Sequence, residues 1–188
     1  GCTARRIADL ADQRGVLSAV GHHWRYSEAV GLAREMLEDR PIRLAVGSWL
    51  DQVPPVTWWI KRTLSGGQIV EQAVHVLDLT RLFVGEVAEV SAYANTTPPS
   101  TPGADVDGAT GAVLRFRSGA VGTVTAACCL AWKHLASLDL HADDLSITIH
   151  EDRITARTPD GPLQRSLRPD DAKKAADRAF VDAVLGRG

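Results

Sequence analysis

Three titratable residues, Glu71, His75 and Asp78, have a spacing that would place them on one narrow stripe of a helix. At 100° per residue they fall within about 60° of one another, on a helix expected over residues 68–84. The opposite side of that helix is mostly apolar: Ile69, Ala73, Val76, Thr80 and Phe83. The stripe is therefore a short polar patch on a largely buried helix, as expected for the wall of a pocket.

The chemistry that this patch suggests is proton transfer. A carboxylate one turn before a histidine accepts a ring N–H, fixes the tautomer and raises the basicity of the other nitrogen. On this reading Glu71 orients His75, and His75 accepts a proton near neutral pH.

Two other readings of the same residues stay open. An i, i+4 pair of Glu and His on a helix surface is commonly a solvent-exposed pair that contributes about 0.2–0.5 kcal/mol. Alternatively, Glu71, His75 and Asp78, completed by His22 or His23, could bind a divalent metal in a hydrolase or lyase. No H-E-x-x-H spacing is present, so we expect no metal. His134, His141 and His150 lie in or beside expected strands and are interpreted as sheet-face residues.

The elements that position this helix divide into an α/β beginning and a β-rich remainder. Residues 3–13 and 16–21 read as a helix followed by a strand, as at the end of an α/β unit. A helix over residues 27–37 follows, with Ser27 as N-cap. Strands are then expected at 42–52, 87–95, 112–117, 120–130, 135–142, 145–149 and 153–157, with a final helix that starts at 169–170. Successive hairpins imply an α+β domain with an open, mainly antiparallel sheet and helices on one face.

The other face of such a sheet would need a partner. Val113, Leu138, Leu140 and Ile147 are expected to supply apolar surface there, so we expect a homodimer or homotetramer that assembles through the sheet.

Composition excludes several classes of protein. The 188 residues carry 21 Lys and Arg against 23 Asp and Glu, so no basic surplus suits a nucleic acid. The longest uncharged stretch, Ser118 to Trp132, is too short and too polar for a membrane span. Charges interrupt residues 1–14, so they are not a signal peptide, and the three cysteines form no disulfide framework. The expected location is the cytoplasm. No nucleophile elbow, P-loop or G-x-G-x-x-G occurs.

Residues 66–78, GGQIVEQAVHVLD, resemble the G-G-x-x-x-[D/E]-x-x-x-H-x-x-D motif of the Gfo/Idh/MocA family of oxidoreductases. Several flanking stretches agree in order along the chain: residues 21–27 (GHHWRYS), 82–90 (LFVGEVAEV), 116–122 (FRSGAVG) and 179–184 (AFVDAV). The resemblance covers nearly the whole chain.

The resemblance implies the C-terminal domain of a two-domain NAD(P)-dependent oxidoreductase that acts on a sugar, polyol or similar small molecule. Residues 1–21 would be a remnant of the nucleotide-binding Rossmann domain, and residues 22–188 the substrate-binding and oligomerisation domain. His75 matches the family's catalytic histidine and Glu71 its acidic partner, and Asp78 matches the motif's last acid. NAD or NADP would bind the complete protein, and we expect none to bind this fragment, which would be inactive alone.

In that complete enzyme, the pocket rim would include residues able to stack on a sugar ring or to hold an acidic substituent: Arg25, Trp58, Trp59, Lys61 and Arg62. Asp78 would contact substrate or anchor the helix. For each rim residue, the alternative is a packed tryptophan or a solvated cation. A non-enzymatic module that binds sugar or mediates assembly also remains an alternative.

Overall fold

The computed structural model describes residues 2–187. The helices are α1 (Cys2–Arg14), the short 3-10 helix η1 (His23–Tyr26), α2 (Glu28–Leu37), α3 (Arg62–Ser65), α4 (Gln68–Glu71), α5 (Val74–Val84) and α6 (Pro169–Val184). The strands are β1 (Leu44–Gln52), β2 (Val87–Asn95), β3 (Ala109–Phe116), β4 (Val121–Leu130), β5 (Leu135–Ala142), β6 (Leu145–His150), β7 (Arg153–Thr158) and β8 (Gly161–Ser166).

All eight of these strands form one open sheet in the order β2-β3-β4-β1-β5-β6-β7-β8. Every neighbouring pair is antiparallel except β1 and β4, which run parallel. The predicted α+β class with a mainly antiparallel open sheet is therefore confirmed. Two features were not predicted from the sequence: the parallel pair at the centre and the edge strand β8.

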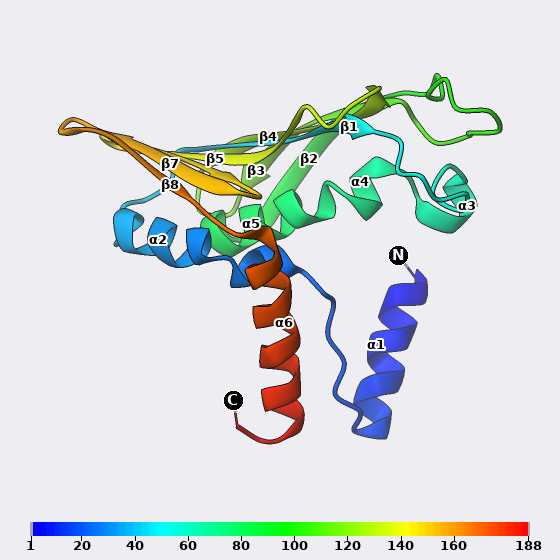
Figure 1. The fold of residues 1–188 in the computed structure, drawn as a ribbon, viewed down its shortest axis with the longest axis horizontal. Helices are drawn as coiled ribbons and strands as arrows, with labels where there is room; N and C mark the ends of the chain where they lie inside the picture. The colour runs from blue at the N-terminus through cyan, green and yellow to red at the C-terminus, as the bar shows by residue number, and fades with distance from the viewer. Residues whose placement is uncertain (1, 188) are drawn as a thin grey trace.

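Helices α2, α4 and α5 lie against one face of this sheet, and α6 and α1 project away from it on the same side (Figure 1). Ser27 caps α2 as predicted, because its Oγ accepts a hydrogen bond from the Ala29 amide at 3.1 Å. The core lies between these helices and the sheet. Its fully buried members include Leu79 of α5 and a row of sheet residues: Leu138, Leu140, Ile147, Ile149 and Ile154.

That row corrects one expectation about the open face of the sheet. Leu138, Leu140 and Ile147 face the helices and have no exposed surface, whereas Val113 does lie on the open face and is 57% exposed. The reason is the period of two along a strand, since a misjudgement of one residue moves a whole apolar set to the other face. The open face is instead rich in small and hydroxyl side chains, such as Ser48 and Thr125, which contact each other at 3.2 Å.

The expected strand over residues 16–21 is also wrong. This segment is an extended connection with no strand partner, and Val16, Leu17 and Val20 are 51–75% exposed. A strand requires a neighbouring strand to pair with its backbone groups, and none of the described residues offers one here. The preceding helix, predicted over 3–13, is confirmed as α1.

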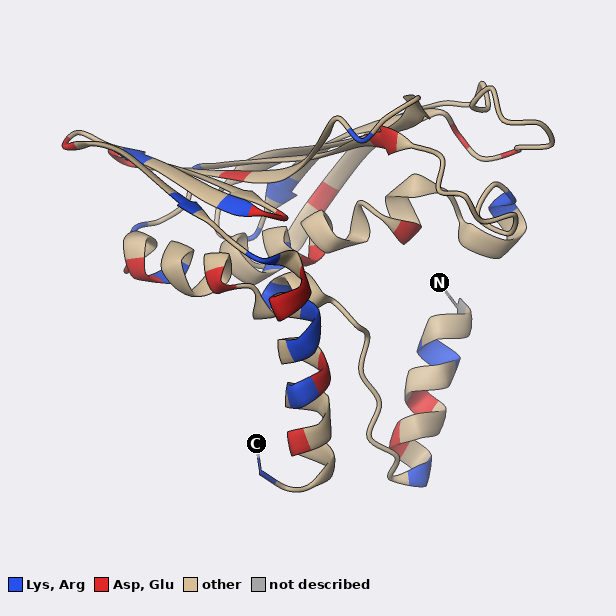
Figure 2. Ribbon diagram, viewed as in Figure 1, with Lys and Arg blue, Asp and Glu red and all other residues tan. Residues whose placement is uncertain are grey.

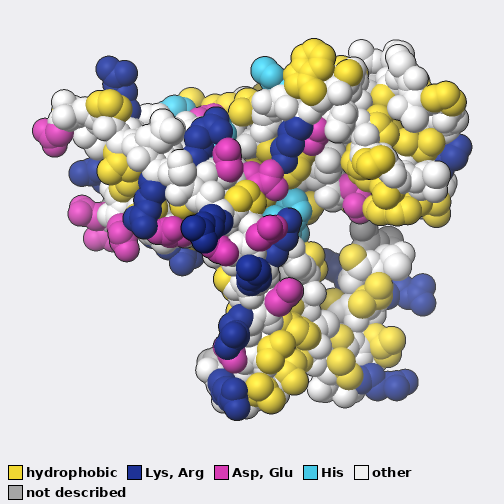
Figure 3. Space-filling view, viewed as in Figure 1, with side chains coloured by type: hydrophobic (Ala, Val, Ile, Leu, Met, Phe, Trp, Pro, Cys, Tyr) yellow, Lys and Arg dark blue, Asp and Glu magenta, His cyan; other side chains and the backbone are white. Residues whose placement is uncertain are grey.

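Helices α1 and α6 expose much apolar surface for elements at the edge of the molecule. Ile7 and Leu10 of α1, and Phe180, Val181 and Val184 of α6, are 40–61% exposed. Charges of both signs are interspersed along the two helices (Figure 2), while hydrophobic side chains gather on their lower parts (Figure 3). No helix within residues 2–187 is both long and apolar enough to cross a membrane.

The contact between α5 and β1 is so close that β1 carries a glycine where the helix crosses it. A Cβ built on Gly47 would lie 2.5 Å from Cγ1 of the fully buried Val76. We expect Gly47→Ala to destabilise the fold by about 1–3 kcal/mol, because it overpacks this contact. The matched control is Gly31→Ala in α2, where a Cβ meets nothing within 4 Å; it should stabilise by up to about 1 kcal/mol. Urea unfolding of both variants measures the difference, and equal stabilities would contradict the packing argument.

Candidate active site

His75 lies in the first turn of α5 and is surrounded by aromatic rings. Its ring centroid is 5.9 Å from that of Trp49, and 6.4 Å from that of Trp24, which stacks on it with an interplanar angle of 13°. His23 and His22 approach edge-on, with centroids 4.7 Å and 6.0 Å away. The imidazole is therefore oriented by packing on several sides.

The helix that carries His75 is not continuous, contrary to the prediction of one helix over residues 68–84. The Gln68 carbonyl accepts hydrogen bonds from the amides of both Gln72 (3.0 Å) and Ala73 (2.9 Å), so one turn is widened and the helix divides into α4 and α5. The widened turn places Ala73 in the core, where it has no exposed surface. Glu71 thus lies at the end of α4, before the break.

Because of that break, Glu71 and His75 do not have the i, i+4 relation of two residues on one face of a continuous helix. Glu71 is half-buried and forms no hydrogen bond with His75, and its charge is not among the causes of the shift in the pKa of His75. The role of Glu71 as the orienting acid stays a prediction.

Asp78 is one turn beyond His75 and is held by Arg25. The guanidinium of Arg25 donates two hydrogen bonds to its carboxylate, from Nε to Oδ2 at 2.5 Å and from Nη2 to Oδ1 at 2.7 Å. Asp78 is only 9% exposed, and this bond further raises the pKa of Arg25. Both residues were predicted to bind substrate, and the structure joins them in an ion pair that anchors η1 to α5.

The other predicted rim residues lie on the segment that leads from β1 to α4. They differ in burial and in the hydrogen bonds that their side chains form. Trp59 is 2% exposed and packs on Val106 and Cys128, whereas Trp58 is 45% exposed. Lys61 donates to the Gly103 carbonyl at 2.6 Å, and the Arg62 guanidinium donates to both oxygens of Asp107 at 2.9 and 2.6 Å. These hydrogen bonds connect the segment to the loop after β2. Among the described residues, none of these four forms a hydrogen bond with the rings around His75.

The sequence analysis did not identify Trp24 and Trp49 as neighbours of His75. Trp49 is also in contact with a cation, because the Lys133 ammonium lies 5.0 Å from the centroid of its ring and pairs with Glu151. Alternation along residues 44–52 places Trp49 on the helix-covered face of β1, which is the one signal that could have found it.

The environment of His75 keeps its imidazole neutral. Burial lowers the pKa of His75 to about 4, and the neighbouring His23 and His22 contribute in the same direction, against the opposing charges of Asp78 and Glu151. Three buried polar atoms of the cluster have no hydrogen-bond partner among the described residues: Nδ1 of His75, Nδ1 of His22 and Nε1 of Trp24. At neutral pH the imidazole is therefore unprotonated, and its low pKa makes it a weaker base than an ordinary histidine, contrary to the raised basicity expected from the sequence.

The metal alternative finds no ligand set in this geometry. Among the described residues, no group of three or more His, Cys, Asp or Glu side chains is arranged to hold a metal ion. Both oxygens of Asp78, one of the three suggested ligands, are engaged by Arg25.

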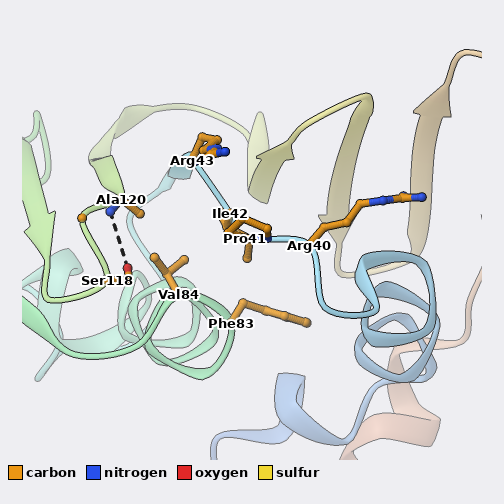
Figure 4. A pocket seen from close by; sticks show the side chains of 9 residues that line it. Arg40, Pro41, Ile42, Arg43, Phe83, Val84, Ser118 and Ala120 are labelled. Atoms are coloured by element: carbon orange, nitrogen blue, oxygen red, sulfur yellow. Dashed lines mark hydrogen bonds between the residues drawn. The ribbon is translucent and has the colours of Figure 1, made fainter.

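A separate cavity of about 360 Å³ lies at the far end of α5 (Figure 4). Its walls include Ile42, Phe83 and Val84, and its charged members, Arg40 and Arg43, extend away from the apolar floor. Arg43 pairs with Asp143 at 2.9 Å. The residues that line this cavity include no histidine, aspartate or glutamate.

Residues 38–155 match the family model described as the GFO/IDH/MocA C-terminal domain. This match covers more than half of the chain and includes His75 with its whole motif. The chain belongs to the GFO/IDH/MocA family. The resemblance predicted from residues 66–78 is confirmed.

Individual relatives are more distant. Levoglucosan dehydrogenase of Pseudarthrobacter phenanthrenivorans is 28% identical over 155 residues, which are 67% of this chain and 40% of that protein. A solved structure of levoglucosan dehydrogenase with NADH and levoglucosan has a TM-score of 0.79 at 22% identity, over 92% of this chain and 58% of that one. UDP-N-acetylglucosamine 3-dehydrogenase from Acidithiobacillus ferrooxidans has a TM-score of 0.77 at 20% identity, over 98% of this chain and 58% of that one. The chain thus spans about 40–60% of the length of these relatives, and the solved structures support the fold.

The depressed pKa of His75 predicts how stability depends on pH. Its folded pKa of about 4 lies below the ordinary value of 6.5, so the unfolded chain binds a proton first as the pH falls. Stability contributed by neutral His75 is fully present above pH 6.5 and is lost between there and about pH 4. His23 and His150, whose pKa values are also lowered by burial, act in the same sense.

We therefore expect His75→Gln to have a shallower loss of unfolding free energy across this pH range than the unmodified chain. Urea unfolding at several pH values measures the slopes. Identical slopes would contradict a buried neutral imidazole at position 75.

Proposed function

We propose that this chain is the substrate-binding and oligomerisation domain of an NAD(P)-dependent oxidoreductase that removes hydride from a hydroxyl-bearing carbon of a sugar, polyol or similar small molecule. The observation that carries the proposal is the neutral imidazole of His75, which lies within the residues that match the family and is held by the rings of Trp24 and Trp49. The names of two relatives, levoglucosan dehydrogenase and UDP-N-acetylglucosamine 3-dehydrogenase, favour a carbohydrate substrate.

The described residues fit the substrate side of such a site and do not supply a dinucleotide cradle. The sequence has no G-x-G-x-x-G loop, and the glycine pair 66–67 leads into α4, a helix of only four residues. The cofactor, when bound by the complete protein, supplies the hydride acceptor. NAD or NADP would bind residues outside this chain, and residues 1–21 would be the end of that nucleotide-binding domain. The apolar side chains of α1 and of the connection after it are exposed, as expected if they pack against the nucleotide-binding domain.

In this proposal, His75 accepts the proton of the substrate hydroxyl as the carbonyl forms. The surrounding rings hold its orientation, and Asp78 and Glu151 favour the imidazolium electrostatically once it has formed. Arg25, paired with Asp78, keeps His22 and His23 in place. Trp58 is exposed at the rim, where it could stack on a sugar ring. Lys61 and Arg62 would support the rim through their bonds to the loop after β2. A reducing cytoplasm remains the expected location.

The test is a dehydrogenase assay of the complete protein that carries this chain. Levoglucosan, UDP-N-acetylglucosamine and inositol are each supplied with NAD⁺ or NADP⁺, and reduced nicotinamide is followed by absorbance. We expect turnover with at least one pair, and a kcat lower by about 10²–10⁴-fold in His75→Gln because its proton acceptor is removed. The 188-residue chain alone should show no turnover. Full activity of His75→Gln would contradict the assigned role.

The open face of the sheet is the proposed assembly surface. Tyr93 and Val113 are 83% and 57% exposed there, at the β2–β3 side of the sheet. We expect Val113→Arg to shift a dimer or tetramer toward the monomer in analytical ultracentrifugation at micromolar concentration, because a charge is costly to bury in an interface. Val184→Arg, a matched change on α6 at a side chain that is 60% exposed, should leave assembly intact. A monomer of the unmodified chain would contradict assembly through the sheet.

A further inference from the structure

Two histidines of the segment before α2 pack against His75, and their surroundings differ. The His22 ring leads inward, because its Nε2 lies 3.9 Å from Oδ1 of Asp78, and its Nδ1 is buried without a partner. His23 has its ring centroid 4.7 Å from that of His75 and lines a small pocket with Glu151 and with Ala172 of α6.

His23 has charged neighbours, of which Lys173 is exposed at the surface. Glu151, from the turn between β6 and β7, and Lys173, from the first turns of α6, are the charged groups that act on His23. Histidine side chains reach the molecular surface between the sheet layer and α6, beside acidic and basic groups (Figure 3).

A proton on His75 needs such an exit. The imidazolium of His75 is disfavoured by burial, which lowers its pKa to about 4, so this residue is poorly suited to keep the proton it takes. The rest of its ring is enclosed by Trp24 and Trp49, neither of which accepts a proton. His23 is half-buried, and its ring is the nearest of those that contact His75.

We propose that His23 is the proton-exit residue of the site, carrying the proton from His75 to solvent in the hydroxyl oxidation proposed above, on which this inference rests. The substrate O–H bond breaks and an N–H bond forms on His75. The hydride leaves the same carbon with its electron pair for the nicotinamide oxidant, and the oxygen lone pair completes the carbonyl. The proton then passes from His75 to His23 and to water, so one proton is released for each hydride transferred. Rotation of the ring about χ2, a soft torsion, is the motion that converts the edge-on contact into a hydrogen bond.

The charges around the two rings suit this direction of transfer. The groups that act on His75 are His22 and His23 before α2, Asp78 of α5 and Glu151 of the β6–β7 turn. Those that act on His23 are His22, Glu151 and Lys173. Asp78 is neutralised by Arg25, and Glu151 by Lys133. Neither carboxylate is therefore left as a bare charge that would trap the proton on His75.

The decisive experiment is buffer rescue in the complete protein, with the substrate and dinucleotide found in the assay above. His23→Gln should lower kcat by about 10-fold at low buffer concentration, less than His75→Gln, since water still accepts protons slowly. A bulky buffer base with a pKa near neutral, too large to fill the cavity left by a side chain, should restore its kcat as the buffer concentration rises. A merely structural role of His23 would not respond to buffer.

Matched controls sharpen the result. His134→Gln makes the same change at an exposed histidine outside the strands, between β4 and β5, and should keep the unmodified kcat at every buffer concentration. His75→Gln should not be restored by the bulky buffer. A His23→Gln protein with unchanged kcat, or with a lowered kcat that buffer leaves unchanged, would overturn the proposal. Rescue of His22→Gln in place of His23→Gln would overturn the assignment to His23.

A second readout needs no activity. In ¹⁵N-edited imidazole spectra of the 188-residue chain, His75 and His23 should titrate as a coupled pair, and His23→Gln should raise the pKa of His75 by removing a neighbour that lowers it. Independent titration of the two rings would count against the relay. If the complete protein oxidises none of the hydroxyl compounds while the coupling is present, the proposed function fails and the ring contact stands.

Discussion

The ion pair between Arg25 and Asp78 is the interaction on which the arrangement of the site depends. It joins the segment before α2 to the middle of α5, two parts of the chain that are 53 residues apart, through two hydrogen bonds. The residues beside Arg25 are His22, His23 and Trp24, three of the four rings that surround His75. Asp78 is 9% exposed and the side chain of Arg25 40%, so the pair is part-buried. Removal of Arg25 would leave the carboxylate of Asp78 without its cation and poorly hydrated. The pair therefore acts as the positional reference for the imidazole chemistry next to it.

How much of this could be predicted from the sequence depends on the range of the interactions. The Ser27 cap and the alternation of β1 are local patterns, and each led to the correct element. The polar stripe with His75 is also a local pattern, but the break between α4 and α5 separates Glu71 from it. The strand over 16–21 and the unbroken helix over 68–84 were wrong for one common reason. Both depend on what the backbone meets elsewhere: a strand partner that is absent among the described residues, and a core position that draws Ala73 inward through a widened turn.

The ring cluster could not be predicted for the same reason. Trp24 comes from η1, Trp49 from the sheet and His75 from α5. They meet only because β1 occupies the centre of the sheet, paired in parallel with β4. A parallel pair between strands so far apart in sequence has no signature in hairpin spacing. Trp58 and Trp59, adjacent in the sequence and both expected at the pocket rim, are divided by the fold into one exposed and one buried ring. Position on the helix-covered face of the sheet, as for Trp49, was thus a better guide to the surroundings of His75 than adjacency in the sequence.

The electrostatics of the site follow from this packing. A histidine enclosed by rings loses its charged state to desolvation, and two further histidines beside it oppose a second positive charge. Carboxylates that could restore the imidazolium are present, yet each is already bound to a cation, Asp78 to Arg25 and Glu151 to Lys133. Their attraction does not outweigh the desolvation, so the imidazole is neutral at neutral pH. A base with so low a pKa releases readily any proton that it takes. In the proposed reaction the proton would leave through a neighbouring ring, and His23 is the ring whose charged surroundings include groups from both the β6–β7 turn and α6.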